Sequence, residues 1–207
     1  MADRERGFFL VLEGLPGSGK TTVGRLLEQS GWVFLPEVAT LLGGKGIPIG
    51  DRGDTSSDFL IFSEEIQRVR EIKRHISEGR NVAADGYFPT DLSFAHARYK
   101  QNQSTCYPTC LNLYLNALTA GTILMPDLYV YLDIPIKDSM ERQKNRKKDD
   151  FTTLNVNILR DVRRHLSFVH QVFESEVPVL KVNAQRDSKE IAKAILNAME
   201  RRKKVSR

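Results

Sequence analysis

One stretch of the chain decides the fold: Gly14-Leu15-Pro16-Gly17-Ser18-Gly19-Lys20-Thr21. It matches the phosphate-binding loop pattern G-x-x-x-x-G-K-[ST] at every fixed position. The apolar run before it, residues 7–13, predicts a buried strand, and residues 21–30 carry apolar side chains at helical spacing. A strand, a glycine-rich loop and a helix N-terminus together form a cradle for phosphate groups.

The residue types of this loop favour a nucleoside triphosphate with Mg²⁺. Glycine has no side chain, so backbone N–H groups can surround the phosphates. We expect Lys20 to bridge the β- and γ-phosphates and the Thr21 hydroxyl to bind Mg²⁺. The alternative, a glycine-rich turn with a chance lysine, does not account for a complete and correctly flanked motif. The expected nucleotide-binding residues are Gly14, Pro16, Gly17, Ser18, Gly19, Lys20, Thr21 and Thr22.

The composition is typical of a globular domain in a reducing cytoplasm. The chain has 207 residues, of which 41% are hydrophobic and 28% charged, which suits a single domain over residues 1–207. The apolar runs are the length of strands, so the sequence predicts no membrane partner, and the charged N-terminus does not resemble a secretory signal. The two cysteines, Cys106 and Cys110, supply at most half of a tetrahedral zinc site.

Short apolar runs alternate with helical patterns along the chain. The predicted strands after the first cover residues 32–35, 81–84, 128–132 and 177–182. The predicted helices after the first cover residues 59–77, 139–147, 156–173 and 188–202. This alternation predicts an α/β fold, with a parallel sheet covered by helices on both faces. Because such sheets bind ligands beyond the carboxyl ends of their strands, the residues there are candidate site residues.

Carboxylates stand at three of these strand ends, as Glu37, Asp85 and Asp133. One carboxylate in such a place can hold Mg²⁺ through water, and another can accept the proton of an attacking hydroxyl. The alternative is that Asp85 and Asp133 cap the helices that follow, which for Asp133 is as good an explanation as function. For Asp85 we favour a catalytic or metal-binding role, and Glu37 is the second candidate base.

A basic cluster follows the fourth strand. Arg142 and Arg146 are four residues apart and therefore share one helix face. Residues 146–153 then lose apolar periodicity, as a lid over a triphosphate would, which predicts a short lid at about residues 142–153. A guanidinium that closes on the transferred phosphoryl group can raise the rate on the order of 10³-fold or more. The alternative is a solvated basic helix end.

The order of these residues resembles the thymidylate kinase-like group of P-loop kinases. Residues 9–22 look like the opening strand and loop of that family. Residues 78–87, Glu-Gly-Arg-Asn-Val-Ala-Ala-Asp-Gly-Tyr, are similar to its EGK-x-V-x-x-DRY segment, and residues 126–142 look like its fourth strand and lid-bearing helix. The resemblance implies a P-loop NTPase fold with a five-stranded parallel sheet, ATP as donor, and acceptor-side helices over about residues 56–120.

Four positions depart from that family. Gly86, Ile66 and Leu35 stand where the family carries arginines that hold the 5′-phosphate of the acceptor, and Pro16 replaces the aspartate of its phosphate loop. A dianion needs paired cations, because buried unpaired charge costs several kcal/mol, so these losses argue against dTMP as the acceptor. The arginines that could compensate are Arg52, Arg68, Arg70 and Arg98.

Residues 35–39, Leu-Pro-Glu-Val-Ala, also resemble ribosylnicotinamide-type and deoxynucleoside kinases, whose acidic residue here contacts or deprotonates the acceptor hydroxyl. The sequence therefore favours a small-molecule kinase that transfers the γ-phosphate of ATP to a hydroxylated acceptor, first of all a nucleoside-type metabolite. Open alternatives are a nucleoside monophosphate kinase, a kinase of a non-nucleotide alcohol, and a nucleotide-dependent switch or ATPase. The basic tail lacks interleaved aromatic residues, which argues against a nucleic-acid partner. The sequence does not decide between a monomer and a homodimer.

Overall fold

The computed structural model describes residues 6–145 and 153–205. Its centre is a five-stranded sheet in which every pairing is parallel, with the strand order β2-β3-β1-β4-β5. The strands are β1 (Phe9–Glu13), β2 (Val33–Leu35), β3 (Val82–Asp85), β4 (Leu128–Asp133) and β5 (Val179–Asn183). The predicted α/β fold with a five-stranded parallel sheet is confirmed.

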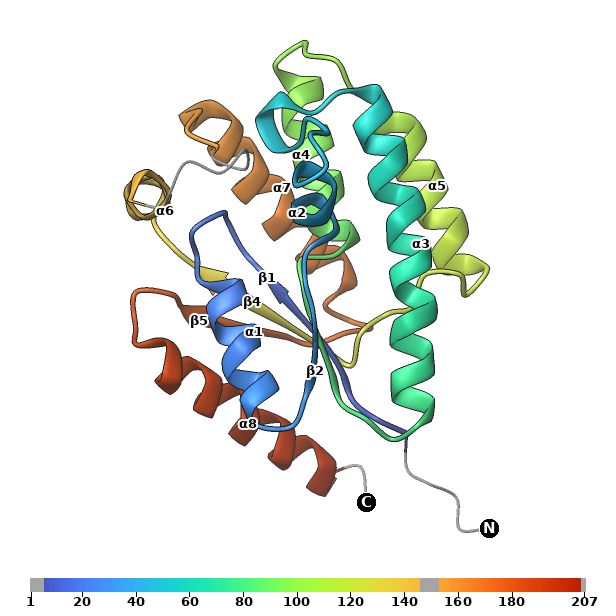
Figure 1. Cartoon of the computed structure of the whole chain (residues 1–207), viewed down its shortest axis with the longest axis vertical. Coiled ribbons are helices and arrows are strands. Elements are labelled where there is room, and N and C mark those ends of the chain that lie inside the picture. Colours follow the sequence, from blue (N-terminus) through green and yellow to red (C-terminus); the bar gives the residue numbers. More distant parts are fainter. Residues whose placement is uncertain (1–5, 146–152, 206–207) are drawn as a thin grey trace.

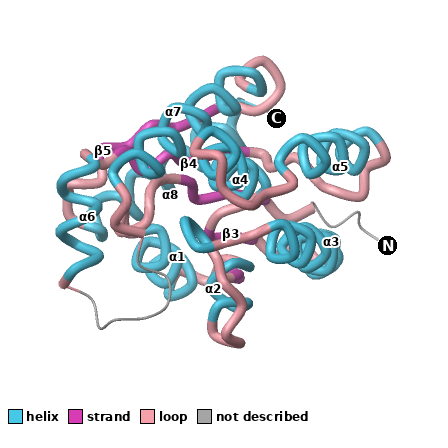
Figure 2. Tube along the Cα trace, turned by 90° about the horizontal axis from the view of Figure 1, so that it is seen from above, coloured by secondary structure: helices cyan, strands magenta, loops and turns pink. Residues whose placement is uncertain are grey.

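Helices cover both faces of this sheet (Figure 1). Helices α1 and α8 lie on one face, and α3, α4, α5 and α7 lie on the other. Seen from above, α5 and α6 lie at opposite sides of the molecule (Figure 2). The helices are α1 (Lys20–Gln29), α2 (Val38–Gly43), α3 (Thr55–Ser77), α4 (Phe88–Lys100), α5 (Tyr107–Thr119), α6 (Ile136–Lys144), α7 (Val156–Phe173) and α8 (Ser188–Val205), with a 3₁₀ turn η1 (Gly50–Arg52).

Strand β1 is buried on both sides, which fixes the origin of the phosphate loop. Leu10 and Leu12 belong to the apolar cluster that includes α1, and Phe9 and Val11 belong to the cluster that includes α3. All four side chains are fully buried. A strand covered by helices on both faces has a continuous apolar sequence rather than an alternating one. For this reason β1 could be predicted from the sequence.

The long helix α3 begins four residues before the predicted start at residue 59. Asp54 caps it, because the Asp54 carboxylate accepts a hydrogen bond from the Ser57 N–H at 2.8 Å. In return, the Asp54 N–H donates to the Ser57 hydroxyl oxygen at 2.7 Å. This reciprocal cap satisfies backbone donors that the first turn of a helix leaves unpaired. It extends the helix toward the loop over residues 44–53.

Helix α4 is absent from the helices that apolar spacing predicted, although it lies within residues 56–120, where the resemblance implied acceptor-side helices. Its inward-facing side includes the buried polar residues Thr90, Ser93 and Arg98. They interrupt the apolar spacing by which an amphipathic helix is recognised. Helix α5 also lies within the region, about residues 56–120, where the family resemblance implied acceptor-side helices.

Helix α1 packs closely against the ring of Phe34 in β2. A Cβ atom added at Gly24 of α1 would lie 2.0 Å from the ring of Phe34 in β2. The glycine therefore lets the helix approach the aromatic ring directly. Because α1 begins at Lys20, this close contact helps to fix the position of the phosphate loop.

None of the helices within residues 6–145 and 153–205 has both the length and the apolar character that a bilayer span requires.

Candidate active site

The phosphate loop runs from the end of β1 to the start of α1. Its backbone is left-handed at Gly17, with φ of +78°, and at Gly19, with φ of +97°, a conformation that glycine adopts without strain. A Cβ atom at Gly17 would also lie 2.9 Å from the carbonyl oxygen of Ser139. The Ser18 hydroxyl is buried and has no hydrogen-bond partner among the described residues. A cradle with an unsatisfied donor fits a phosphate group.

Lys20, Thr21 and Asp85 meet beside this loop. The Thr21 hydroxyl donates to Asp85 Oδ2 at 2.6 Å, and Lys20 Nζ lies 3.9 Å from Asp85 Oδ1. Lys20 Nζ also donates to the carbonyl oxygen of Gly14 at 3.1 Å. Asp85 can stand here because β3 pairs with β1 and places Asp85 opposite Leu12.

The Thr21–Asp85 pair fits a Mg²⁺ site of the kind that relies on phosphate oxygens. Asp85 is buried, and in the described part of the chain its Oδ1 accepts no hydrogen bond. Groups of three or more His, Cys, Asp or Glu side chains that could hold a metal are absent from that part. Mg²⁺ at nucleotides commonly takes one or two carboxylates, with water and phosphates as the other ligands. The capping alternative for Asp85 is wrong, since the cap of α4 is Tyr87.

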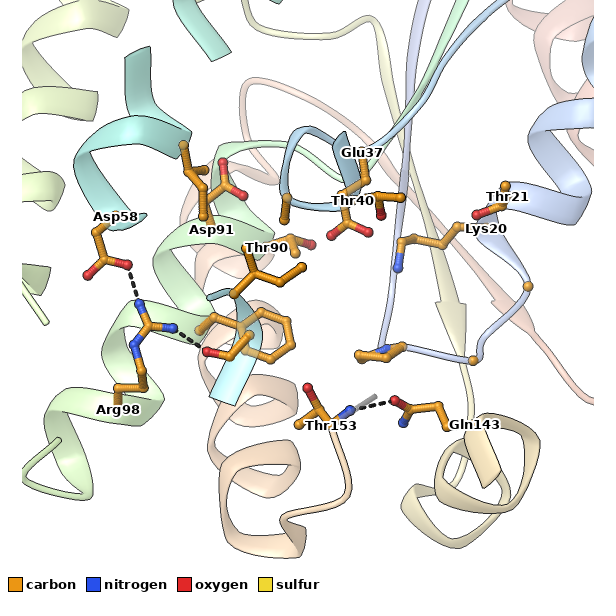
Figure 3. A pocket seen from close by; sticks show the side chains of 18 of the residues that line it. Lys20, Thr21, Glu37, Thr40, Asp58, Thr90, Asp91, Arg98, Gln143 and Thr153 are labelled. Atoms are coloured by element: carbon orange, nitrogen blue, oxygen red, sulfur yellow. Dashed lines mark hydrogen bonds and ion pairs between the residues drawn. The ribbon is translucent and has the colours of Figure 1, made fainter. Parts of the chain in front are cut away.

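A cavity of about 540 Å³, which we call the acceptor pocket, extends from the phosphate loop to α4 (Figure 3). Lys20 and Thr21 line one side of it, and Asp58 and Arg98 line the other. Between them the wall includes Glu37, which comes from the segment after β2. A pocket of this size can hold a small molecule in contact with the phosphate loop.

Glu37 is a carboxylate with a perturbed pKa in the wall of this pocket. Burial raises its pKa, Asp85 adds to the increase, and the positive charge of Lys20 opposes it. Gly86 leaves room for it, since a Cβ atom there would lie 3.2 Å from Glu37 Oε1. A carboxylate whose pKa is raised is a stronger base and is better suited to accept a proton from a hydroxyl. This geometry fits the expected role as a base.

Two further acids near the pocket were missed in the sequence. Glu13, the last residue of β1, is fully buried, accepts a hydrogen bond from the Thr90 hydroxyl, and has its pKa raised to about 8 by burial. Asp91 lines the pocket, and burial, assisted by Glu65, holds its pKa well above the usual range. The available signal was a charged residue at the end of the apolar run over residues 8–12.

The buried arginine Arg68 is bound to acids and carbonyls. Arg68 Nη2 lies 2.8 Å from Glu65 Oε1, and Arg68 Nη1 donates to the carbonyl oxygens of Pro36 at 2.9 Å and Asp85 at 3.1 Å. It also donates to the carbonyl oxygen of Gly86. Arg68 thereby joins α3 to the ends of β2 and β3, and we interpret it as a structural cation.

The other arginines considered for the acceptor are also engaged or exposed. Arg98 forms a buried ion pair with Asp58. Arg70 is exposed and donates to Gln67 Oε1 at 3.0 Å, and Arg52 is exposed on the 3₁₀ turn.

Arg142 lies against the phosphate loop from α6. Its guanidinium donates to the carbonyl oxygen of Ala184 at 2.9 Å and to that of Gly17 at 3.4 Å. In the same way, the hydroxyl of Ser139 donates to the carbonyl oxygen of Pro16 at 2.7 Å. Arg146 and most of the predicted lid lie outside the described residues.

Asp133 does not cap the helix that follows it and is engaged in ion pairs. It forms ion pairs with Arg163 at 2.6 Å and with Lys181 at 3.1 Å. The cap of the following helix α6 is Pro135, which has no side-chain oxygen to offer.

The sequence of this chain aligns with those of known proteins over nearly its whole length. It is 30% identical to the probable thymidylate kinase of Thermococcus gammatolerans, over 94% of this chain and 96% of the relative. It is 29% identical to the probable thymidylate kinase of Pyrococcus abyssi, over 92% and 95%. The chain belongs to the thymidylate kinase family. No family model matches it. Membership makes it an enzyme, a P-loop kinase that transfers a phosphoryl group.

Solved structures with the same fold as this chain include a kinase. A structure of deoxyadenosine kinase from M. mycoides with dCMP and a flexible dCDP bound superposes with a TM-score of 0.73, covering 93% of this chain and 99% of that one. A second structure of that kinase, with bound dATP, gives 0.71. The sequence identity to both is 16%, so the likeness concerns the fold.

Proposed function

We propose that the protein transfers the γ-phosphate of ATP, with Mg²⁺, to a hydroxyl group of an unphosphorylated nucleoside-type acceptor. One observation carries the choice of acceptor. Outside the phosphate loop, the acceptor pocket is lined by the acids Glu37, Asp58 and Asp91, and the one cation among its described lining residues there, Arg98, is already paired with Asp58.

A phosphorylated acceptor would meet the wrong charges in this pocket. A phosphate monoester carries a charge of about −1.5 to −2 at neutral pH and needs cations that are not already committed. Arg68 and Arg98 are each held by an acid, Glu65 and Asp58. Glu37 stands where an accepting phosphate would approach the donor, and like charges there would oppose binding. A neutral hydroxyl avoids this repulsion.

Each of these residues has its own role in the proposed reaction. Lys20 holds the donor phosphates, and Thr21 with Asp85 would hold Mg²⁺, which when bound neutralises charge on the β- and γ-phosphate oxygens. Glu37 accepts the proton of the acceptor hydroxyl. The hydroxyl oxygen then bonds to the γ-phosphorus while the bond from that phosphorus to the bridging oxygen breaks, and ADP leaves. The protein contributes chiefly by positioning these groups and stabilising charge.

A nucleoside monophosphate acceptor is the second candidate, because the curated relatives are named thymidylate kinases. The nucleoside acceptor is in turn favoured by the neighbours named deoxyadenosine kinase.

A coupled assay with ATP and Mg²⁺ separates these functions. The four deoxynucleosides are compared with their 5′-monophosphates, with ribose as a simple alcohol and with no acceptor. We expect kcat/KM to be at least tenfold higher for one nucleoside than for its monophosphate. Faster turnover of dTMP than of every nucleoside would refute the proposal. ATP hydrolysis that no acceptor accelerates would instead indicate a switch or ATPase.

A further inference from the structure

Arg98 stands out among the residues that line the acceptor pocket. It comes from the last turns of α4, and its side chain is 2% exposed. In Figure 3 it lies on the opposite side of the pocket from Lys20. A molecule whose hydroxyl lies beside the donor phosphates would therefore direct its other end toward Arg98.

The guanidinium of Arg98 is held in one orientation. It forms an ion pair with Asp58, which is marked in Figure 3, and donates to the carbonyl oxygen of Gly50. The loop fits closely around it, because a Cβ atom at Gly53 would lie 2.8 Å from Arg98 Nη1. Asp58 is itself fixed, since its Oδ2 accepts from the Thr105 hydroxyl at 2.7 Å and from the Cys106 N–H at 3.2 Å.

These contacts do not use all the hydrogen-bond donors of Arg98. A guanidinium has five N–H groups, and the contacts to Asp58 and Gly50 use two of them. Arg98 Nε is buried and has no hydrogen-bond partner within residues 6–145 and 153–205. Leaving a buried donor unsatisfied is unfavourable, so a guanidinium in a pocket wall is suited to a ligand that accepts hydrogen bonds.

The surroundings of Arg98 select the chemistry of that ligand. Asp58 cancels the positive charge, which removes the advantage of an anion and favours a neutral acceptor atom. Phe94 and Ile61 line the same pocket and offer apolar surface to a flat ring. A carbonyl oxygen or an unprotonated ring nitrogen on a planar heterocycle meets both conditions.

We propose that Arg98 is a specificity-determining residue of the acceptor site. It donates to a carbonyl oxygen or ring nitrogen of a planar heterocycle, at the end of the acceptor remote from the hydroxyl that is phosphorylated. The proposal rests on the proposed function, in that the acceptor is the molecule that occupies this pocket. Asp58 acts through Arg98 as a positioning residue.

The test compares an acceptor with and without its hydrogen-bonding ring. The probes are the preferred deoxynucleoside, the abasic sugar 1,2-dideoxyribose, and the phenyl deoxyriboside, whose ring cannot accept in-plane hydrogen bonds. Arg98→Lys keeps a cation for Asp58 but removes the fork of donors. We expect it to lower kcat/KM for the nucleoside about 10- to 100-fold, the range of one charge-assisted hydrogen bond. The abasic sugar, the phenyl deoxyriboside and the KM for ATP should be unaffected.

Lys100→Met is the matched control, because Lys100 lies on the same helix with an exposed side chain paired with Asp161. It should change none of these values. An equal loss of turnover on all three acceptors in Arg98→Lys, or no loss on any, would overturn the proposal. If that variant does not fold, the pair is replaced as Arg98→Met with Asp58→Asn, and the same selective loss is required.

The wild-type enzyme tests the proposal without any variant. Turnover of the phenyl deoxyriboside as efficient as that of the nucleoside would also overturn the proposal. Failure of the proposed function has a different signature, namely that the wild type accepts only monophosphates. The comparison is then made between the preferred monophosphate and 2-deoxyribose 5-phosphate. A base preference lost in Arg98→Lys would still support the role of Arg98.

Discussion

The two ends of the acceptor pocket are built in different ways. The phosphate cradle of the donor end comes from one contiguous stretch, residues 14–21, whose backbone surrounds the phosphates and whose glycines adopt the left-handed conformations that this requires. The acceptor end is assembled from the segment after β2, the loop before α3, and helices α3 and α4. Its polar side chains include the acids Glu37, Asp58 and Asp91, and its arginine Arg98 is paired with Asp58. The donor end can therefore be read from a short motif, whereas the acceptor end exists only once the chain has folded.

The largest effect is expected at the donor end, from Lys20→Ala. Lys20 lies between the phosphate loop and Asp85, where it serves the phosphates rather than the core. We expect kcat to fall on the order of 10³-fold, as when a preorganised charge is removed from a reacting group, with little change in melting temperature. Steady-state kinetics and a thermal melt measure both. Lys189→Ala, on the exposed start of α8, is the control.

Near-normal turnover of the Lys20→Ala protein would contradict the kinase mechanism at the phosphate loop. A collapse in melting temperature would show instead that Lys20 supports the fold, and the donor end would then resemble the acceptor end in depending on buried side chains.

Glu37→Gln tests whether Glu37, which lies between the donor and acceptor ends, is the base. The amide keeps the shape but cannot accept the proton, so kcat should fall on the order of 10²-fold while the KM for ATP stays constant. Burial raises the pKa of Glu37, so wild-type kcat/KM should fall as the pH drops below that raised pKa. The variant should lack this acidic limb.

The companion variant Asp85→Asn distinguishes the two carboxylates. Asp85 bonds to Thr21, so we expect a higher Mg²⁺ requirement rather than loss of the acidic limb. An acidic limb that persists in Glu37→Gln and disappears in Asp85→Asn would exchange the roles of the two residues.

Arg142→Ala is expected to have a smaller effect. In the structure its guanidinium holds the carbonyl oxygens of Gly17 and Ala184, and so steadies the donor end from α6. Loss of these contacts should raise the KM for ATP about fivefold, from about 1 kcal/mol of net hydrogen bonding. Lys144→Ala, exposed on the same helix, is the control. A fall in kcat at constant KM would show that Arg142 leaves the carbonyls and acts in the transition state, as the sequence led us to expect.

Glu13→Gln should have the smallest effect, on stability. In the unfolded chain a glutamate loses its proton near pH 4.5, whereas the folded protein keeps the proton of Glu13 until about pH 8. Between these values the folded state binds the extra proton, so this group's contribution to stability declines as the pH rises to about 8 and is constant above it. The glutamine has no proton to lose. The variant should therefore melt several degrees above the wild type at pH 8.5 and close to it at pH 5.

Thermal melts of both proteins at the two pH values check this prediction, with Glu28→Gln on the exposed side of α1 as the control. A difference in melting temperature that does not vary with pH would mean that Glu13 is not titrated in the folded protein over this range.

The sequence predicted the parts of the molecule that depend on local patterns. The phosphate loop has a fixed spacing, and the strands that flank it are apolar runs, so the parallel sheet and the positions of Lys20, Thr21 and Asp85 at its edge could be inferred. The ends of the neighbouring strands β1 and β3 necessarily lie together in a parallel sheet, which is why Asp85 could be placed near Thr21 without a structure.

The acceptor end could not be inferred in this way. Asp58 and Arg98 are 40 positions apart in the chain, and neither stands in a recognisable motif. Arg98 faces inward on a helix whose buried side is partly polar, which concealed the helix itself. Its partner Asp58 is expected on the exposed side of a helix when charge alone is considered. Only the folded arrangement shows that each makes the burial of the other tolerable.

The close approach of α1 to Phe34 sets a limit on engineering this enzyme. Replacing a glycine within a helix by alanine is a common way to make a protein more heat-resistant. At Gly24 the added methyl group would meet the aromatic ring at 2.0 Å, so the helix would have to tilt away from the sheet. The first residue of that helix is Lys20. A substitution chosen only to raise thermal stability would thus displace the lysine that holds the donor. The absence of a side chain at Gly24 therefore helps to keep the reactants aligned.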